Sequence, residues 1–252
     1  MNRFLVEPAQ LSPDAIAVID ASTGERTTRA ELLQATRSVA RLLLSRGVVP
    51  EQRIIMCCLD SKAFLAWFWG TMWIGAVPVP VSTMLTEKDY QFLIEDSRAV
   101  GLVISDALKE SVGQAAENQP FLSWTQKDDD VPELNVDAEF GTPFPAVDDD
   151  IAFWLYTSGT TGFPKGAMHR HADLAFCTDM YAKAVLGMNS EDVVYSVAKL
   201  FFAYGLGNAG YFPPGTGASA ILNPGRPVPE DIAEHTYVYI ARPFFLAYPR
   251  PT

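Results

Sequence analysis

Short apolar runs alternate along the chain with amphipathic segments, in the order typical of an α/β protein. Each run has the length of a buried strand. The runs lie at residues 53–59, 77–81, 100–104, 151–155 and 193–197. This alternation predicts an α/β fold with mostly parallel sheets flanked by helices.

The segments between these runs begin at residues that cap helices. Thr28 and Glu31 have the spacing of a capping box, and the helix that follows has an apolar face and ends near Gly47. Ser61 and Thr86 precede two further helical segments in the same way. The predicted helices cover about 29–46, 62–75, 87–97 and 171–186, and Ser105 is a candidate cap for another.

Residues 63–81 contain no charged side chain, and their length barely reaches a membrane span. Gly70, Gly75, Pro78 and Pro80 interrupt the segment. We therefore predict a buried helix followed by a short strand.

Residues 124–150 differ from the rest of the chain because they combine prolines with the Asp triplets 128–130 and 148–150. Consecutive carboxylates repel one another and point in different directions. We therefore interpret this segment as a solvated linker and not as a cation site.

Composition and charge exclude several kinds of partner. The 252 residues are 48% hydrophobic and 19% charged, which indicates a globular chain with a sizeable core. The net charge of -11 argues against nucleic acid or an anionic membrane, since both attract basic surfaces. ATP is still a possible ligand, because one lysine and aligned backbone amides are enough to bind phosphates.

The cysteines and the first residues favour the cytoplasm. Cys57, Cys58 and Cys177 lack any metal-binding spacing, so free thiols in a reducing compartment are expected. Residues 1–11 have no long apolar stretch, and no signal peptide is predicted. The His169-Arg170-His171 sequence has no further Cys or His nearby, so we assign no metal site.

The strongest chemical signal is the run from Tyr156 to Gly166, which reads YTSGTTGFPKG. A buried strand leads into a loop of small and hydroxyl-bearing residues, whose glycines let backbone N–H groups approach a ligand closely. Pro164 excludes a Walker A loop, which ends in Gly-Lys-Ser/Thr. The composition of the loop suits a polyphosphate. The predicted phosphate-binding residues are Thr157, Ser158, Gly159, Thr160, Thr161, Gly162 and Lys165.

This run closely resembles the phosphate-binding signature of the AMP-forming acyl-adenylate superfamily, which includes acyl-CoA synthetases, luciferases and peptide-synthetase adenylation domains. Residues 199–208, KLFFAYGLGN, resemble the motif that builds the acyl pocket, in the form found in benzoate-CoA ligases and close aryl-CoA ligases. The resemblance covers about residues 12–234. It implies the N-terminal part of the large adenylate-forming domain, with the small C-terminal domain absent.

The resemblance also implies that Phe202, Ala203, Tyr204 and Gly205 bind the substrate. Physical reasoning agrees, because Phe201, Phe202 and Tyr204 beside glycines suit a flat apolar slot for a ring. The same aromatic side chains would also fit an ordinary core. Lys199, the first residue of the 199–208 stretch, is a further candidate to face the ligand.

The implied reaction uses ATP, Mg²⁺ and coenzyme A. A small aromatic carboxylate attacks the α-phosphate of Mg-ATP, and the CoA thiol then displaces AMP to give a thioester. Lys165 is expected to assist at the β- and γ-phosphates as an auxiliary catalytic residue.

The later motifs of the superfamily, which bind magnesium and ribose and supply a C-terminal lysine, have no counterpart in the sequence. We therefore expect residues 1–234 to form a truncated AMP-binding domain and residues 235–252 to be an atypical tail of frameshift origin. Three interpretations follow. The chain is part of an aryl-acid CoA ligase completed by a separate C-terminal half or by self-association, a non-catalytic module that binds nucleotide or aryl acid, or an inactive remnant.

Overall fold

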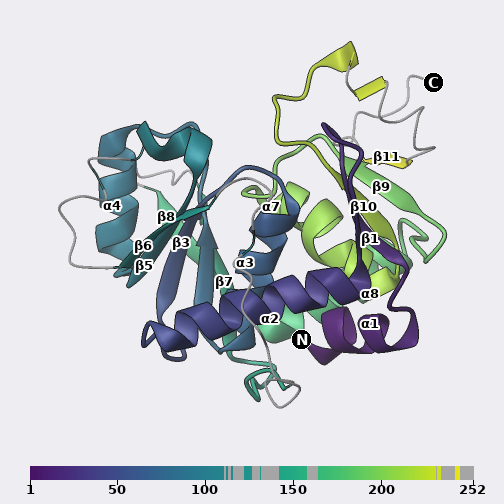
Figure 1. Ribbon diagram of the computed structural model, residues 1–252, viewed down its shortest axis with the longest axis horizontal. Coiled ribbons are helices and arrows are strands. Elements are labelled where there is room, and N and C mark those ends of the chain that lie inside the picture. Colours follow the sequence, from purple (N-terminus) through teal and green to yellow (C-terminus); the bar gives the residue numbers. More distant parts are fainter. Residues whose placement is uncertain are drawn as a thin grey trace.

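The computed structural model describes residues 1–110, 112, 115, 122–126, 131, 142–157, 164–230, 232–233 and 242–244. A four-stranded sheet and a five-stranded sheet lie side by side (Figure 1). Helix α3 (Lys62–Trp73) lies between them, and α2 (Arg29–Ser45) runs across both and packs on α3. The α/β class with mostly parallel sheets is confirmed.

The four-stranded sheet is entirely parallel and has the order β4-β3-β5-β6. Ile55 pairs with Val79 on one side and with Leu102 on the other. Helix α4 (Glu87–Ser97) covers the outer face, where Tyr90 and Leu93 share a core cluster with these strands. The strands are β3 (Arg53–Cys57), β4 (Val77–Pro80), β5 (Gly101–Ser105) and β6 (Leu122–Gln126).

The five-stranded sheet has the order β11-β9-β10-β1-β2, and within it β1 and β2 pair antiparallel. Val18 of β1 pairs with Ala220 of β10, so the sheet joins the two ends of the described chain. The strands are β1 (Ile16–Asp20), β2 (Arg26–Thr28), β9 (Val193–Ser196), β10 (Ser219–Leu222) and β11 (Arg242–Phe244). Because β11 pairs in parallel with β9, residues 242–244 continue this sheet within the segment that we expected to be an atypical tail.

An antiparallel hairpin of β7 (Ile151–Thr157) and β8 (Lys165–Arg170) forms a separate two-stranded sheet, and β7 contacts β4. Strand β7 matches the predicted apolar run. Strand β8 was not predicted, because its side chains are exposed or half-buried and give no apolar pattern.

The predicted helix caps are present. Thr28 and Glu31 form a capping box at α2, and Thr86 and Asp89 form one at α4. The Ser61 hydroxyl accepts the backbone N–H of Phe64 at the start of α3. The other helices are α1 (Glu7–Leu11), α6 (His171–Cys177), α7 (Ala203–Gly205) and α8 (Phe212–Thr216), with π-helical turns at Asn2–Val6, Thr178–Lys183 and Leu206–Tyr211 and a 3₁₀ turn at Asp106–Leu108.

Two local predictions were wrong. Ser105 caps no helix, because its hydroxyl accepts the backbone N–H of Leu59 at 3.0 Å instead. Residues 124–126 belong to strand β6 and not to a linker, because they pair in parallel with β5 at the edge of the sheet.

One core cluster extends through both sheets. Val103 of β5, Val194 of β9 and Leu43 of α2 are among its buried members. Every residue from Ala63 to Trp73 in α3 is buried, which explains why the helix carries no charge after the half-buried Lys62 at its start. Across the described part of the chain, the helices are too short or too polar to cross a bilayer.

Candidate functional site

A cleft of about 1190 Å³ opens where parallel strands of both sheets end. Four of its walls begin one to three residues after the ends of strands β3, β4, β9 and β10. These walls are residues 58–60, 83–84, 197–199 and 224–227, and the remaining lining residues are Leu108, Phe201, Phe202 and Tyr204. In open α/β sheets ligands bind outside the carboxyl ends of the strands, so the position of this cleft favours a ligand site.

Three aromatic side chains of the predicted acyl-pocket motif line the cleft. Phe202 is 48% exposed, whereas Phe201 is only 7% exposed. The two ring centroids are 4.5 Å apart, and the ring planes are inclined by 53°. Burial raises the pKa of the Tyr204 phenol above its ordinary value. The aromatic part of the lining is therefore an apolar surface with one phenol.

The other two predicted substrate-binding residues do not line the cleft. Ala203 is exposed, and Gly205 is buried in α7. A Cβ atom at Gly205 would lie 2.1 Å from the Lys199 carbonyl oxygen and 2.4 Å from that of Ala198. Gly205 thus allows α7 to pack on the backbone that leads to Phe201. Substrate contact by Ala203 and Gly205 stays a prediction.

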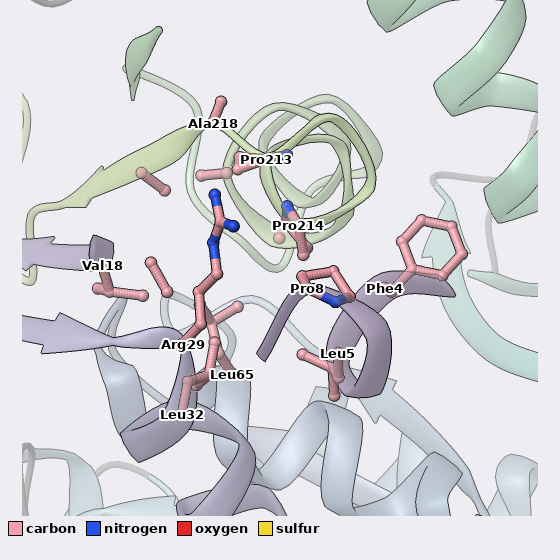
Figure 2. Close-up of a pocket in the computed structure, with 14 residues that line it drawn as sticks. Phe4, Leu5, Pro8, Val18, Arg29, Leu32, Leu65, Pro213, Pro214 and Ala218 are labelled. Atoms are coloured by element: carbon pink, nitrogen blue, oxygen red, sulfur yellow. The ribbon is translucent and has the colours of Figure 1, made fainter. Parts of the chain in front are cut away.

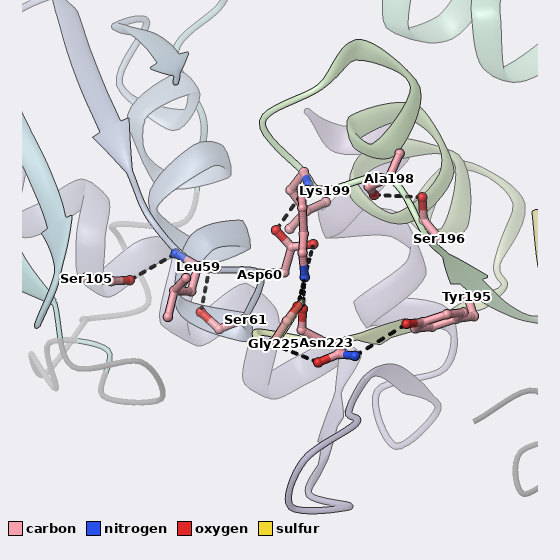
Figure 3. A network of polar contacts seen from close by, with 11 residues as sticks. Leu59, Asp60, Ser61, Ser105, Tyr195, Ser196, Ala198, Lys199, Asn223 and Gly225 are labelled. Carbon is pink, nitrogen blue, oxygen red and sulfur yellow. Dashed lines mark hydrogen bonds and ion pairs between the residues drawn. The ribbon is translucent and has the colours of Figure 1, made fainter. Parts of the chain in front are cut away.

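A polar network lies at the base of the aromatic motif (Figure 3). The Asp60 Oδ1 accepts the backbone N–H of Leu200 at 3.1 Å, and Oδ2 lies 4.0 Å from the Lys199 Nζ. The same Nζ donates to the carbonyl oxygens of Asn223 and Gly225, each at 2.5 Å. Lys199 therefore connects the loops that follow β3, β9 and β10.

Burial sets the acid–base behaviour of this pair. It raises the pKa of Asp60 to about 6, although the Lys199 ammonium and the Leu200 N–H both oppose that shift. It also lowers the pKa of Lys199, and the Asp60 carboxylate opposes that shift in turn. At neutral pH the two groups form an ion pair inside the protein.

The predicted phosphate loop is described only at its two ends. Thr157 and Lys165 are exposed and pair across the β7–β8 hairpin. Residues 158–163 lie outside the described residues, and with them the predictions for Ser158, Gly159, Thr160, Thr161 and Gly162. Neither Thr157 nor Lys165 lines the cleft. Phosphate binding by this loop stays a prediction.

The two histidines after the loop have structural contacts. The His169 ring stacks on Phe153 with centroids 4.5 Å apart, and His171 is the first residue of α6. Burial lowers the pKa of both imidazoles. Among the residues that the structure describes, no three His, Cys, Asp or Glu side chains gather into a metal site.

A second cavity is too small for a substrate. It has a volume of about 20 Å³ and lies between α8 and the N-terminal helices (Figure 2). Its lining is apolar apart from Arg29, whose guanidinium donates to the Gly217 carbonyl oxygen at 2.5 Å. Such a cavity holds at most one or two waters.

Sequence reasoning missed Asp60 and the 223–227 loop as parts of the cleft. Asp60 had a detectable signal, because it is a charged residue directly after an apolar strand, the usual place for a site residue in a parallel sheet. The 223–227 loop follows β10, a strand that the pattern did not predict. No local signal therefore identified this loop.

Most of this chain is similar to parts of known proteins. Residues 5–243 match the family described as AMP-binding enzyme. The benzoate–CoA ligase of Thauera aromatica is 38% identical over 208 residues, which are 80% of this chain and 40% of that protein. The 4-hydroxybenzoate–CoA/benzoate–CoA ligase of Rhodopseudomonas palustris is 39% identical over 210 residues, 80% of this chain and 39% of that protein.

Solved structures share the fold. A benzoate CoA ligase from Burkholderia xenovorans LB400 has a TM-score of 0.82 and 37% identity, over 92% of this chain and 47% of that one. The anthranilate CoA ligase AuaEII in complex with anthranoyl-AMP has a TM-score of 0.78 and 26% identity, over 88% of this chain and 44% of that one. The chain spans about 40% of the length of the curated relatives it matches. Its fold is that of the N-terminal adenylate-forming domain of CoA ligases, and the chain belongs to the AMP-binding enzyme family.

Proposed function

We propose that this chain is part of a benzoate-type aryl-acid CoA ligase, and that the cleft between the two sheets holds the aromatic acid. The observation that carries the proposal is the position of Phe202 and Tyr204, which line the cleft at the carboxyl ends of the strands. A mostly apolar slot with a few polar groups suits a flat ring that carries one carboxylate.

The relatives support this substrate class. Two of them are named for benzoate or 4-hydroxybenzoate, and the AuaEII structure contains anthranoyl-AMP. Each of these acids is a benzene ring with one carboxyl group, and they differ only in a small substituent. The ring itself is therefore the shared feature that the aromatic slot would recognise.

In the proposed reaction a carboxylate oxygen of the acid bonds to the α-phosphorus of ATP, and pyrophosphate leaves with the electron pair. The CoA sulfur then bonds to the acyl carbon, its proton is released, and AMP leaves. Lys165 contributes positive charge beside the β- and γ-phosphates, and the Thr157 hydroxyl donates to them. Mg²⁺ would accompany ATP and offset part of the charge of its phosphates.

We also propose the cytoplasm as the location. Cys57, Cys58 and Cys177 are free thiols in this structure, as expected for a reducing compartment. A net charge of -11 fits small-molecule substrates better than a nucleic-acid partner.

The decisive assay is benzoate-dependent exchange of labelled pyrophosphate into ATP. The assay compares the purified chain with Lys165→Ala and with Lys88→Ala, an exposed lysine on α4. We expect exchange in the parent and in Lys88→Ala, and a loss of about 100-fold in Lys165→Ala, the usual effect of removing one charge that stabilises a transition state. A folded chain without exchange would instead support the non-catalytic binding module or the inactive remnant.

Binding of benzoate tests the slot apart from the chemistry. Phe202→Ala removes an exposed ring of the cleft, and Phe176→Ala removes a ring that is 67% exposed on α6, away from the cleft. We expect calorimetry to give a benzoate Kd about tenfold higher for Phe202→Ala, in keeping with the energy of an aromatic contact, and an unchanged Kd for Phe176→Ala. Equal values for both variants would place the acid elsewhere.

A further inference from the structure

The walls of the cleft belong to segments far apart in the sequence. Residues 58–60 follow β3 of the four-stranded sheet, whereas 197–199 and 224–227 follow β9 and β10 of the five-stranded sheet. A slot built from such separate segments keeps a fixed width only if side chains connect them. The Asp60–Lys199 pair makes this connection (Figure 3).

The Lys199 ammonium has acceptors that are themselves held in place. The Asn223 Oδ1 accepts the Gly225 N–H at 2.8 Å, so residues 223–225 form a tight turn. The Asn223 Nδ2 donates to the Tyr195 Oη at 3.4 Å, which ties this turn to β9. The side chain of Lys199 is only 19% exposed, so its charge is directed at these partners and not at solvent.

Asp60 connects the same cation to the other sheet. Asp60 is 5% exposed. Its Oδ1 accepts the backbone N–H of Leu200, which directly precedes the Phe201–Phe202 pair. The position of the aromatic rings thus depends on both partners. Gly205 restricts the same backbone from its other side, through the close approach to the carbonyls of Ala198 and Lys199.

We propose that Asp60 and Lys199 are positioning residues that fix the width of the aryl slot and make the cleft select flat rings over puckered ones. The inference rests on the proposed function, which supplies the aromatic acid. A preorganised slot binds the shape it fits more tightly, because the ordering of its walls is complete before the ligand arrives. Releasing either partner would loosen the walls and remove the preference for a planar ring.

The test compares the Kd of benzoate with that of cyclohexanecarboxylate, which has the same carboxylate on a puckered ring. Lys199→Met removes the charge at similar length, and Asp60→Asn keeps an acceptor for the Leu200 N–H but removes the charge. Lys199→Arg restores the cation, and Lys183→Met breaks a lysine–aspartate pair with Asp179 outside the cleft. Hydrogen exchange at the Leu200 and Gly225 amides is followed in the same proteins.

We expect the parent and Lys183→Met to prefer benzoate, and the ratio of the two Kd values to fall by about fivefold to tenfold in Lys199→Met and Asp60→Asn, the size of a modest pocket discrimination. Lys199→Arg should recover most of the preference. An unchanged ratio in both charge-removing variants would overturn the inference and leave the proposed function intact.

A parent chain that binds neither acid would contradict the proposed function alone. The positioning role is then judged by exchange. At least about tenfold faster exchange at Leu200 and Gly225 in both variants, as expected when local opening becomes easier, would support it. Unchanged exchange would refute it.

Discussion

At the scale of single residues, Asp60 is a carboxyl buried in the protein with its pKa raised to about 6. Burial alone would keep it neutral, and the Lys199 ammonium and the Leu200 N–H make ionisation possible at neutral pH. The positioning role that we propose for the pair therefore does not require a large contribution to stability. A neutral side chain of the same shape would avoid the desolvation cost but would also lose its hold on Lys199.

The raised pKa of Asp60 predicts a pH dependence of stability. A carboxyl with a folded-state pKa of about 6, above its unfolded value, contributes stability that is complete below the unfolded pKa and is lost as the pH rises through about 6. Between pH 5 and pH 7.5 this group should lower the free energy of unfolding by about 1 kcal/mol.

Urea denaturation at pH 5 and pH 7.5 measures this effect. Asp60→Asn cannot titrate, so its free energy of unfolding should change less between the two pH values by about 1 kcal/mol. Asp14→Asn, an exposed aspartate, should follow the parent. If all three proteins respond alike to pH, the carboxyl of Asp60 has an ordinary pKa.

At the scale of elements, the helices that support the site start at residues whose side chains cap them. In α2 the Thr28 hydroxyl accepts the Glu31 N–H at 3.2 Å, and the Glu31 carboxylate accepts the Thr28 N–H at 2.7 Å. These bonds satisfy backbone donors that otherwise have no partner in the first turn. The cap fixes where α2 begins and so which of its faces packs on α3.

Thr28→Ala should therefore lower the free energy of unfolding by about 1 kcal/mol, the usual effect of losing a cap. Ser45→Ala at the other end of α2 removes one exposed hydroxyl that bonds to the Leu42 carbonyl, and its effect should stay within about 0.5 kcal/mol. Thermal and urea unfolding of both variants provide the comparison. A Ser45→Ala loss as large as that of Thr28→Ala would mean that the capping box adds nothing.

At the scale of the whole molecule, the two sheets share one core. Leu43 of α2 is fully buried in the cluster that includes Val103 of the four-stranded sheet and Val194 of the five-stranded sheet. Because the cleft lies where strands of both sheets end, the shared core supports the strands on both of its sides. Loss of packing in α2 should therefore destabilise both sheets together.

Leu43→Ala tests this coupling. We expect a loss of about 2 to 5 kcal/mol in the free energy of unfolding, the range for a large-to-small change in a core. Far-ultraviolet circular dichroism and tryptophan fluorescence should still give one coincident transition. Leu11→Ala, at a side chain that is 83% exposed, is the matched control and should resemble the parent. Two separated transitions would show that the sheets fold independently.

The sequence determined most of what is local. Alternating apolar runs predicted β3, β4, β5, β7 and β9, and capping residues predicted the starts of α2, α3 and α4, because strand burial and helix capping depend on neighbours a few positions away. The family was evident from its motifs for the same reason. Strands β1, β2, β6, β8, β10 and β11 were not predicted. Strands β1 and β10 pair with each other from opposite ends of the described chain, so the sequence near either strand does not reveal its partner.

The cleft was decided by tertiary structure. The KLFFAYGLGN motif identified Phe202 and Tyr204, and both line the cleft. The motif did not reveal Asp60, which is 139 positions from Lys199 in the sequence yet lies 4.0 Å from its Nζ. Nor did it show that Gly205 packs on backbone and not on the cleft. An ion pair between two sheets depends on how the sheets pack, and no local pattern of residues encodes that distance.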